Sequence, residues 1–120
     1  MDTIRVREKA AMYEIEIYQT EAGKEPFVEW TDSLDVTIST RIEARIARIR
    51  NSGNLGDYKS LKEGVYELRL DFGQGYRIYF GLEGDTKRVV ILLICGSKKG
   101  QHKDIDKAKQ YWQDHLSRQK

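Results

Sequence analysis

The sequence predicts an α+β domain built on a four-stranded sheet, with two helices near the N-terminus and one at the C-terminus. Apolar and polar residues alternate through residues 64–80 on both sides of a glycine-bounded turn, which is typical of a β-hairpin. Residues 89–95 form a continuous apolar run, which indicates a central strand covered on both faces. Isoleucines recur at the spacing of one helix face, at Ile38, Ile42, Ile46 and Ile49.

The elements are expected in the order strand, two helices, three strands and helix. Residues 13–18 alternate and form the first strand, and residues 25–30 form a short helix with Pro26 in its first turn. Asp35 or its neighbourhood opens the second helix, which runs to about Asn51. The last helix follows a glycine-bounded loop, and its inward positions are Ile105, Ala108, Trp112 and Leu116.

The register of the hairpin in residues 64–80 decides which side chains share a sheet face. A two-residue loop would pair Leu70 with Arg77 and mix apolar with charged residues. A three-residue loop over residues 73–75 pairs Leu70 with Ile78 and keeps the apolar residues on one face. We therefore expect the three-residue loop.

With this register, the opposite face carries Asp71 beside Arg77, and Arg69 beside Tyr79. Two guanidinium groups and a phenol then lie together on an open sheet surface, which suits the binding of an anion. Tyr79 could stack on a base or transfer a proton. The alternative is a solvated face, on which Asp71 neutralises Arg77 and Tyr79 is only a cross-strand aromatic.

Composition bounds the class of protein. The chain has 120 residues, 33% of them charged, with a formal net charge of +2, which fits one domain without a membrane span. Charges are scattered through the first nine residues, so we expect no signal peptide. We therefore expect the protein in the cytoplasm. We expect a flexible arm over residues 1–11 and a single domain over residues 12–120. The single Cys95, with His102 and His115, gives no zinc-ligand spacing, so neither a metal nor another cofactor is expected.

Basic residues outside the hairpin are further candidates for binding nucleic acid, and the first group lies on the second helix and before the hairpin. Arg41, Arg45 and Arg48 form one stripe of the second helix, which suits nucleic acid or an acidic partner, or is simply a solvated face. Lys59 and Lys62 precede the hairpin and extend the basic surface towards it.

The second group follows the central strand and consists of Lys98, Lys99 and His102. His102 is the best candidate for a general acid or base, because the ordinary pKa of histidine is about 6.5. The sequence shows no partner that orients it.

Taken as an ordered set, these motifs resemble the RelE/ParE superfamily of bacterial toxins, and most closely its HigB-like branch, the addiction module killer proteins. The motifs are FVEW at 27–30, RIARI at 45–49, GNLGDYK at 53–59, GVYELR at 64–69, GYRIYF at 75–80 and LLICG at 92–96. The resemblance implies a small RelE-like fold, with a twisted, mostly antiparallel sheet, the first strand mixed in at one position, and helices packed on one side.

The resemblance also implies a function. It implies the toxin of a type II toxin-antitoxin system, with a cognate helix-turn-helix antitoxin encoded next to it that alone contacts operator DNA. RelE-like members cleave messenger RNA on the ribosome without metal, by attack of the ribose 2′-OH on the adjacent phosphate. By position, Arg69 and Arg77 would bind the scissile phosphate and Tyr79 would orient a base. The candidates for proton transfer are Lys98, Lys99 and His102.

Two alternatives remain at the level of the sequence. The first is a ParE-like inhibitor of DNA gyrase, which binds a protein and needs no catalytic residues. The second is a non-toxic corepressor that acts with its antitoxin. The basic hairpin face favours the endoribonuclease, because gyrase binding has no evident use for that face.

Overall fold

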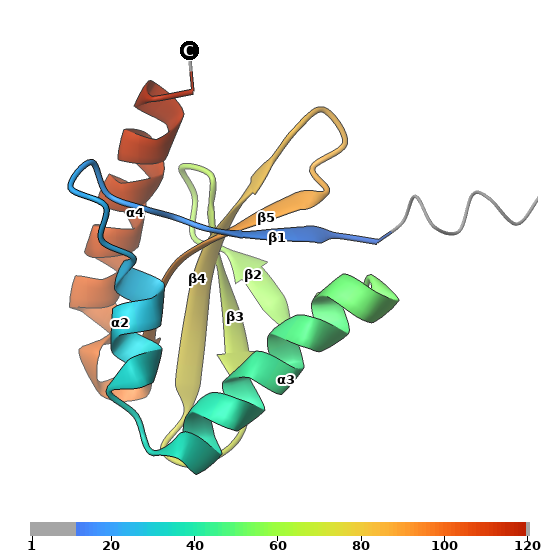
Figure 1. The fold of residues 1–120 in the computed structure, drawn as a ribbon, viewed down its shortest axis with the longest axis vertical. Coiled ribbons are helices and arrows are strands. Elements are labelled where there is room, and N and C mark those ends of the chain that lie inside the picture. Colours follow the sequence, from blue (N-terminus) through green and yellow to red (C-terminus); the bar gives the residue numbers. More distant parts are fainter. Residues whose placement is uncertain (1–11, 120) are drawn as a thin grey trace, which may run out of the picture.

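A mixed five-stranded sheet forms the centre of the molecule (Figure 1). The computed structural model describes residues 12–119, so the expected arm over residues 1–11 lies outside the described residues. The strand order is β1-β5-β4-β3-β2. The strands are β1 (Glu14–Ile17), β2 (Tyr58–Ser60), β3 (Val65–Leu70), β4 (Tyr76–Glu83) and β5 (Val89–Ser97). Only β1 and β5 pair in parallel within the described chain.

The predicted α+β class and element order are confirmed, with one strand more than expected. The additional strand is β2, which pairs with β3 at the edge of the sheet. It is three residues long and all three are exposed, so it lacks the alternation of burial from which a strand is predicted. Its pairing with β3 therefore comes from tertiary context.

The helices are α2 (Pro26–Asp32), α3 (Val36–Ser52) and α4 (Gln101–Ser117), and a 3₁₀ turn over Lys98–Gly100 precedes α4. Pro26 stands in the first turn of α2, as predicted. Asp35 caps α3 by accepting a hydrogen bond from the backbone N–H of Thr37, and Gly53 ends the helix with a left-handed φ of 73°. No helix within residues 12–119 is long and apolar enough to cross a membrane.

The helices cover both faces of the sheet, so the implied packing on one side is wrong. α2 and α3 enclose one core, and α4 encloses a second core on the opposite face. The continuous apolar run of β5 explains this, because Leu92 and Cys95 face the first core while Leu93 and Ile94 face the second. Two consecutive residues face α4 because the register with β4 shifts at this point, as in a β-bulge.

α4 lies close to the sheet at one end because the sheet carries a glycine there. A Cβ atom on Gly81 would lie 2.3 Å from the Trp112 ring, so only glycine admits the indole. Trp112 and Ala108 are buried as predicted, whereas Leu116 is 41% exposed and does not face inward.

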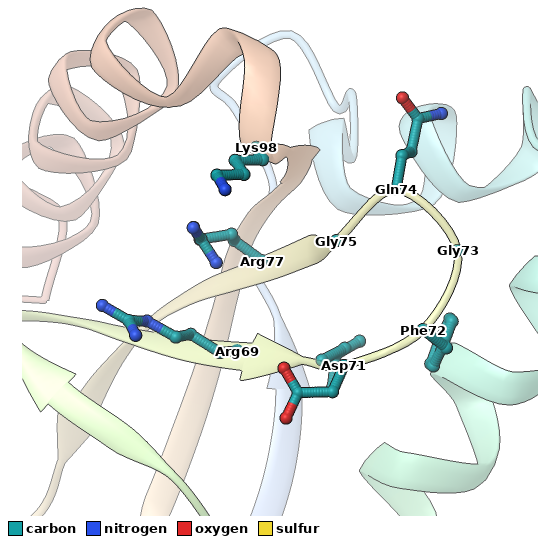
Figure 2. Close-up of a pocket in the computed structure, with 9 residues that line it drawn as sticks. Arg69, Asp71, Phe72, Gly73, Gln74, Gly75, Arg77 and Lys98 are labelled. Carbon is teal, nitrogen blue, oxygen red and sulfur yellow. The ribbon is translucent and has the colours of Figure 1, made fainter.

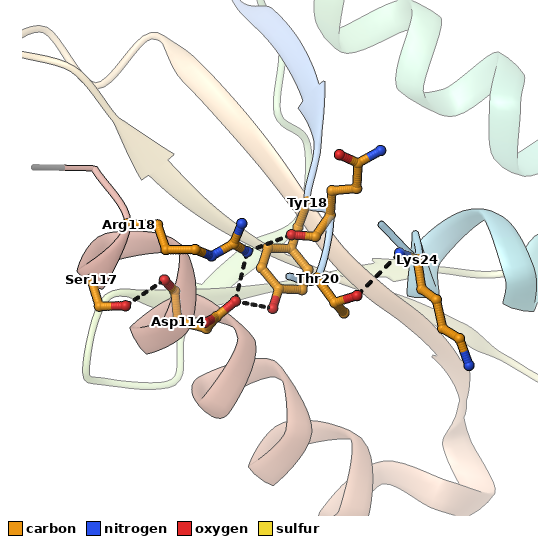
Figure 3. Close-up of polar contacts among 7 residues, drawn as sticks. Tyr18, Thr20, Lys24, Asp114, Ser117 and Arg118 are labelled. Carbon is orange, nitrogen blue, oxygen red and sulfur yellow. Dashed lines mark hydrogen bonds and ion pairs between the residues drawn. The ribbon is translucent and has the colours of Figure 1, made fainter. Parts of the chain in front are cut away.

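The last turn of α4 is tied to the chain that follows β1. The Tyr18 hydroxyl donates to Asp114 over 2.5 Å, and Arg118 contacts the same carboxylate at 2.6 Å (Figure 3). Burial, followed by the hydrogen bond to Asp114, raises the pKa of Tyr18 to about 12. These contacts fix the C-terminal half of α4 over the sheet.

The predicted hairpin register is wrong by two residues. β3 and β4 pair Leu70 with Tyr76 and Leu68 with Ile78, so residues 71–75 form the loop. The turn closes through a hydrogen bond of 3.0 Å from the Gly75 N–H to the Phe72 carbonyl. Phe72 lies outside the ladder, and its ring packs on Tyr76 with ring centroids 5.6 Å apart. A shift of two keeps every side chain on its face but changes its partner.

Candidate functional site

An open pocket of about 530 Å³ lies at the end of the hairpin, where the chain also passes from β5 to α4. Arg69 comes from β3, Arg77 from β4, and Lys98 from the turn after β5. Figure 2 shows their cationic ends on the same side of the sheet. The Lys98 backbone N–H donates to the Gly75 carbonyl over 2.9 Å, which joins this turn to the hairpin loop. Three segments therefore bring three cations to one pocket.

The corrected register places Arg69 directly opposite Arg77. Like charges in this position repel one another, so the pair needs a counter-charge. Glu67 provides it, instead of the expected Asp71, through contacts of 3.3 Å to Arg69 Nε and 3.6 Å to Arg77 Nε. The Arg69 side chain is 44% exposed and that of Arg77 is 11% exposed. Both guanidinium groups therefore remain within reach of a ligand in the pocket.

Tyr79 does not lie on an open surface. It pairs with Glu67 across the strands, is fully buried in the core beneath α4, and its hydroxyl has no hydrogen-bond partner within residues 12–119. Burial, followed by the nearby Glu67 charge, raises the pKa of Tyr79 far above that of a free tyrosine. In this conformation Tyr79 can neither stack on a base nor exchange a proton with a substrate, so the expected role fails because α4 covers this part of the face.

The predicted cluster after β5 is only partly joined to the arginine pair. Lys98 lines the pocket with Arg69 and Arg77, and it also lines an adjoining pocket of about 460 Å³ over residues 98–103. Lys99 and His102 line this second pocket and not the first, and both are exposed. No hydrogen bond orients the His102 ring within the described part of the chain.

The arginine stripe of α3 continues the hairpin pocket. A third pocket, also of about 460 Å³, is lined by Arg41, Arg45 and Arg48 and shares residues 69–72 with the first. We call the two together the basic groove, defined by the cations Arg41, Arg45, Arg48, Arg69, Arg77 and Lys98. Lys59 and Lys62 are exposed but line neither pocket, so they do not extend the groove as expected.

Two arginines of the stripe are engaged in structural contacts. Arg45 Nη2 donates to the Leu55 carbonyl over 2.8 Å, and its guanidinium covers Gly56 so closely that a Cβ there would lie 1.6 Å away. Burial, followed by the charge of Arg48, lowers the pKa of Arg45. The Arg41 guanidinium lies 4.1 Å from the centre of the Phe72 ring, in a cation–π contact. Arg48 is exposed and makes no such contact with residues 12–119.

Sequence reasoning missed Glu67, Gln101 and Phe72. The strand alternation does place Glu67 on the face of Arg69. Its burial depends on α4 crossing that face, and the sequence pattern does not contain that information. The alternation of apolar and polar residues continues through Phe72, so it places this residue in a strand and does not reveal the longer loop.

Comparisons with known proteins address the family and the fold. Residues 29–113, which include the whole basic groove, match the family described as Phage derived protein Gp49-like (DUF891). An uncharacterised protein of Haemophilus influenzae is 45% identical over 84 residues, which cover 69% of this chain and 82% of that protein.

Two solved structures share the fold. The RelBE toxin-antitoxin complex of E. coli contains a chain that is 19% identical with a TM-score of 0.53, over 71% of this chain and 95% of that one. A free double arginine-to-alanine mutant of the E. coli toxin RelE is 16% identical with a TM-score of 0.55, over 91% of this chain and 99% of that one. The chain therefore belongs to the Gp49-like family of phage-derived proteins and has the fold of the RelE toxins, as its resemblance to the RelE/ParE superfamily predicts.

Proposed function

We propose that this protein is the toxin of a type II toxin-antitoxin system and cleaves messenger RNA on the ribosome at the basic groove. The observation that carries the proposal is the convergence of Arg69, Arg77 and Lys98, from three segments, in one open pocket. Guanidinium groups bind phosphate through paired donors, and an RNA phosphodiester fits this chemistry. The RelE-like fold supports the same conclusion.

The proposed reaction is the one that the resemblance to RelE-like toxins implies, and the donors in the pocket suit it. The ribose 2′-OH gives its proton to a general base, for which the neutral form of His102, Lys98 or Lys99 is the candidate, and attacks the adjacent phosphorus. The bond to the 5′-oxygen breaks, and that oxygen takes a proton from a general acid of the same group. The products are a 2′,3′-cyclic phosphate and a 5′-hydroxyl. Negative charge builds on the non-bridging oxygens during this step, and Arg69 and Arg77 stabilise it.

In this proposal the residues after β5 transfer the protons. Lys98 lies in the pocket itself, so it is the first candidate, and Lys99 and His102 lie in the adjoining one. An ammonium group in this position protonates the departing 5′-oxygen or stabilises its charge. Tyr79 takes no part, because it is buried.

The α3 side of the groove binds the RNA backbone beyond the cleaved bond. Arg48 is free to contact a phosphate, and Arg41 can do so at the cost of its contact with Phe72. Arg45 is held by Leu55, so it contributes charge at a distance. Binding through phosphate contacts weakens as salt concentration rises, which gives the groove a measurable signature.

A cognate antitoxin holds the toxin inactive in this proposal. One structure with the same fold is a toxin-antitoxin complex, which supports a partner of this kind. The antitoxin is a helix-turn-helix protein encoded next to the toxin, and operator DNA is contacted only through it. The toxin acts in the cytoplasm, where it meets translating ribosomes.

The test is to induce the chain in a bacterial host without its antitoxin and to map new 5′ ends of messenger RNA on ribosomes. The variants are Arg69→Ala, which removes a half-exposed cation of the pocket, and Arg50→Ala as a matched control. Arg50 is exposed on α3 but lines a different pocket, between β1 and α2.

We expect growth arrest and codon-phased ends with the wild type and Arg50→Ala, and neither with Arg69→Ala. Growth arrest with intact messages and a DNA-damage response would assign the protein to gyrase inhibition. Normal growth with all three proteins, with antitoxin binding retained, would favour the corepressor.

A further inference from the structure

Glu67 is a fully buried carboxylate between the hairpin and the start of α4, and the reaction proposed above does not use it. Its Oε2 atom lies 3.3 Å from Arg69 Nε and 3.6 Å from Arg77 Nε. Its Oε1 atom accepts a hydrogen bond of 3.0 Å from Gln101 Nε2. Both carboxylate oxygens therefore have partners, and all three partners are side chains at the rim of the site.

The geometry of these contacts fixes the arginine pair. Both Nε atoms face the same oxygen, so the two guanidinium groups are held relative to one another as well as to the sheet. Each keeps its terminal amino groups for a ligand, because only Nε faces Glu67. The Arg77 Nε atom is buried and, at 3.6 Å, too far from Oε2 for a hydrogen bond, so within the described part of the chain the ion pair with Glu67 compensates its burial.

The charge of Glu67 has a second consequence. Arg69 and Arg77 are direct cross-strand neighbours, and repulsion between them would drive the more exposed Arg69 away from Arg77. A buried anion between the two Nε atoms removes this repulsion at close range, where screening by water is weak. The two donors can then converge on a single phosphate.

Gln101 links this arrangement to the helix that covers the face. It is the first residue of α4, and its amide is the hydrogen-bond donor to Oε1. The N-terminus of α4 is therefore connected to both arginines through this carboxylate.

We propose that Glu67 is a positioning residue, whose buried carboxylate orients Arg69 and Arg77 towards one substrate phosphate under the control of the α4 N-terminus. This inference rests on the proposed function for its substrate. It goes beyond that function because it makes the cleavage rate depend on a residue that does not contact the substrate.

The test compares Glu67→Gln and Glu67→Asp with a matched control, Glu63→Gln. Glu67→Gln keeps the size and an acceptor for Gln101 but removes the charge. Glu67→Asp keeps the charge but draws the carboxylate back by one methylene, about 1.5 Å. Glu63 is another carboxylate that contacts α4, through Lys109 at 3.2 Å, but it is exposed and touches neither arginine.

Two readouts separate positioning from folding. The first is the single-turnover rate at which the protein cleaves a defined message on purified ribosomes, corrected for the folded fraction. The affinity of the protein for these ribosomes is measured in parallel. The second is the ¹⁵N–¹H NMR signals of the Arg69 and Arg77 Nε–H groups in the full chain, assigned through Arg-to-Lys variants. A merely structural Glu67 would lower the folded fraction but not the rate per folded molecule.

For Glu67→Gln we expect the single-turnover rate to fall by about 100-fold, as for a misplacement of about 1 Å, with affinity changed by less than about threefold. Both Nε–H signals should shift and lose protection from exchange. Glu67→Asp should lose about tenfold in rate, and Glu63→Gln should match the wild type in both readouts.

The inference is overturned if folded Glu67→Gln cleaves at the wild-type rate with unchanged Nε–H signals. If Glu67→Gln does not fold, Glu67→Asp decides, because wild-type rate and signals in that variant would equally overturn it. A wild-type protein that cleaves no message refutes the proposed function instead, and the NMR signals still show whether Glu67 orients the arginines.

Discussion

Three cross-strand pairs on one face of the β3–β4 hairpin experience three different environments. Val65 and Gly81 lie under Trp112, Glu67 and Tyr79 are buried next to them, and Arg69 and Arg77 open into the pocket. The backbone is the same regular ladder throughout. The difference comes from α4, which covers one end of the face and starts at Gln101 before it reaches the other. The same sheet face therefore provides core at one end and a cationic site at the other.

The largest expected effect is on the stability of the covered end. Trp112→Ala removes the indole that packs on Gly81 and leaves a cavity in the second core. We expect the free energy of unfolding to fall by about 3–5 kcal/mol. Urea denaturation followed by circular dichroism measures this loss. A loss below about 1 kcal/mol would mean that α4 is not firmly packed on the sheet.

At the open end the expected effect is on activity. Arg69→Ala removes one donor to the charge that develops on the phosphate, so we expect the cleavage rate to fall by about 10²–10³-fold. Stability should fall by about 1–3 kcal/mol, because Arg69 donates the hydrogen bond to Oε2 of the buried Glu67 carboxylate. Single-turnover cleavage and thermal unfolding of the same preparation measure the two. If Arg69→Ala lost stability but kept the wild-type cleavage rate, the open end of the hairpin would serve the fold and not the reaction.

Tyr79→Phe tests where the boundary between the ends lies. The Tyr79 hydroxyl is buried and has no partner among the residues that the structure describes, so its removal breaks none of their hydrogen bonds. We expect stability to stay level or to rise by up to about 1 kcal/mol, with cleavage within about twofold of the wild type. A tenfold loss of cleavage, measured at equal folded fraction, would show that α4 moves aside and exposes Tyr79 during the reaction.

The smallest expected effect concerns Asp104 in the first turn of α4. Burial raises the pKa of this carboxyl above its ordinary 3.8, so the folded state binds its proton more tightly than the unfolded state does. Its contribution to stability is therefore present at acid pH and lost as pH rises through the raised pKa. We expect Asp104→Asn to flatten this part of the pH profile of unfolding. An unchanged slope between wild type and variant would contradict the assignment.

Much of the fold follows from patterns that are local in the sequence. The isoleucine spacing, Asp35, Gly53 and the apolar run of β5 each predict an element, because helix and strand periods are local properties. The register of the hairpin does not follow in this way, because shifts of two residues leave the alternation unchanged. Nor does the short edge strand β2, whose exposed residues carry no pattern.

The site was predictable to a similar extent. Arg69, Arg77 and Lys98 were expected near one another, and they share the pocket because strand ends and the following turn meet at one edge of the sheet. The roles of Tyr79 and Glu67 depend on where α4 lies, which is a long-range property of the packing. The periodicity of α4 shows that it has an apolar face but not how far along the sheet that face extends.

The central claim is that the open end of the hairpin cuts an RNA phosphodiester through its 2′-OH. The most direct test incubates the purified protein with two preparations of programmed ribosomes. One carries a defined message, and the other carries the same message with a 2′-deoxynucleotide on the 5′ side of the cleaved bond. We expect the first message to be cut, leaving a 2′,3′-cyclic phosphate, and the second to remain intact. Arg69→Ala should cut the first message slowly, and Arg50→Ala at the wild-type rate. Cleavage of the deoxy message, or equal rates for the two variants, would contradict the account.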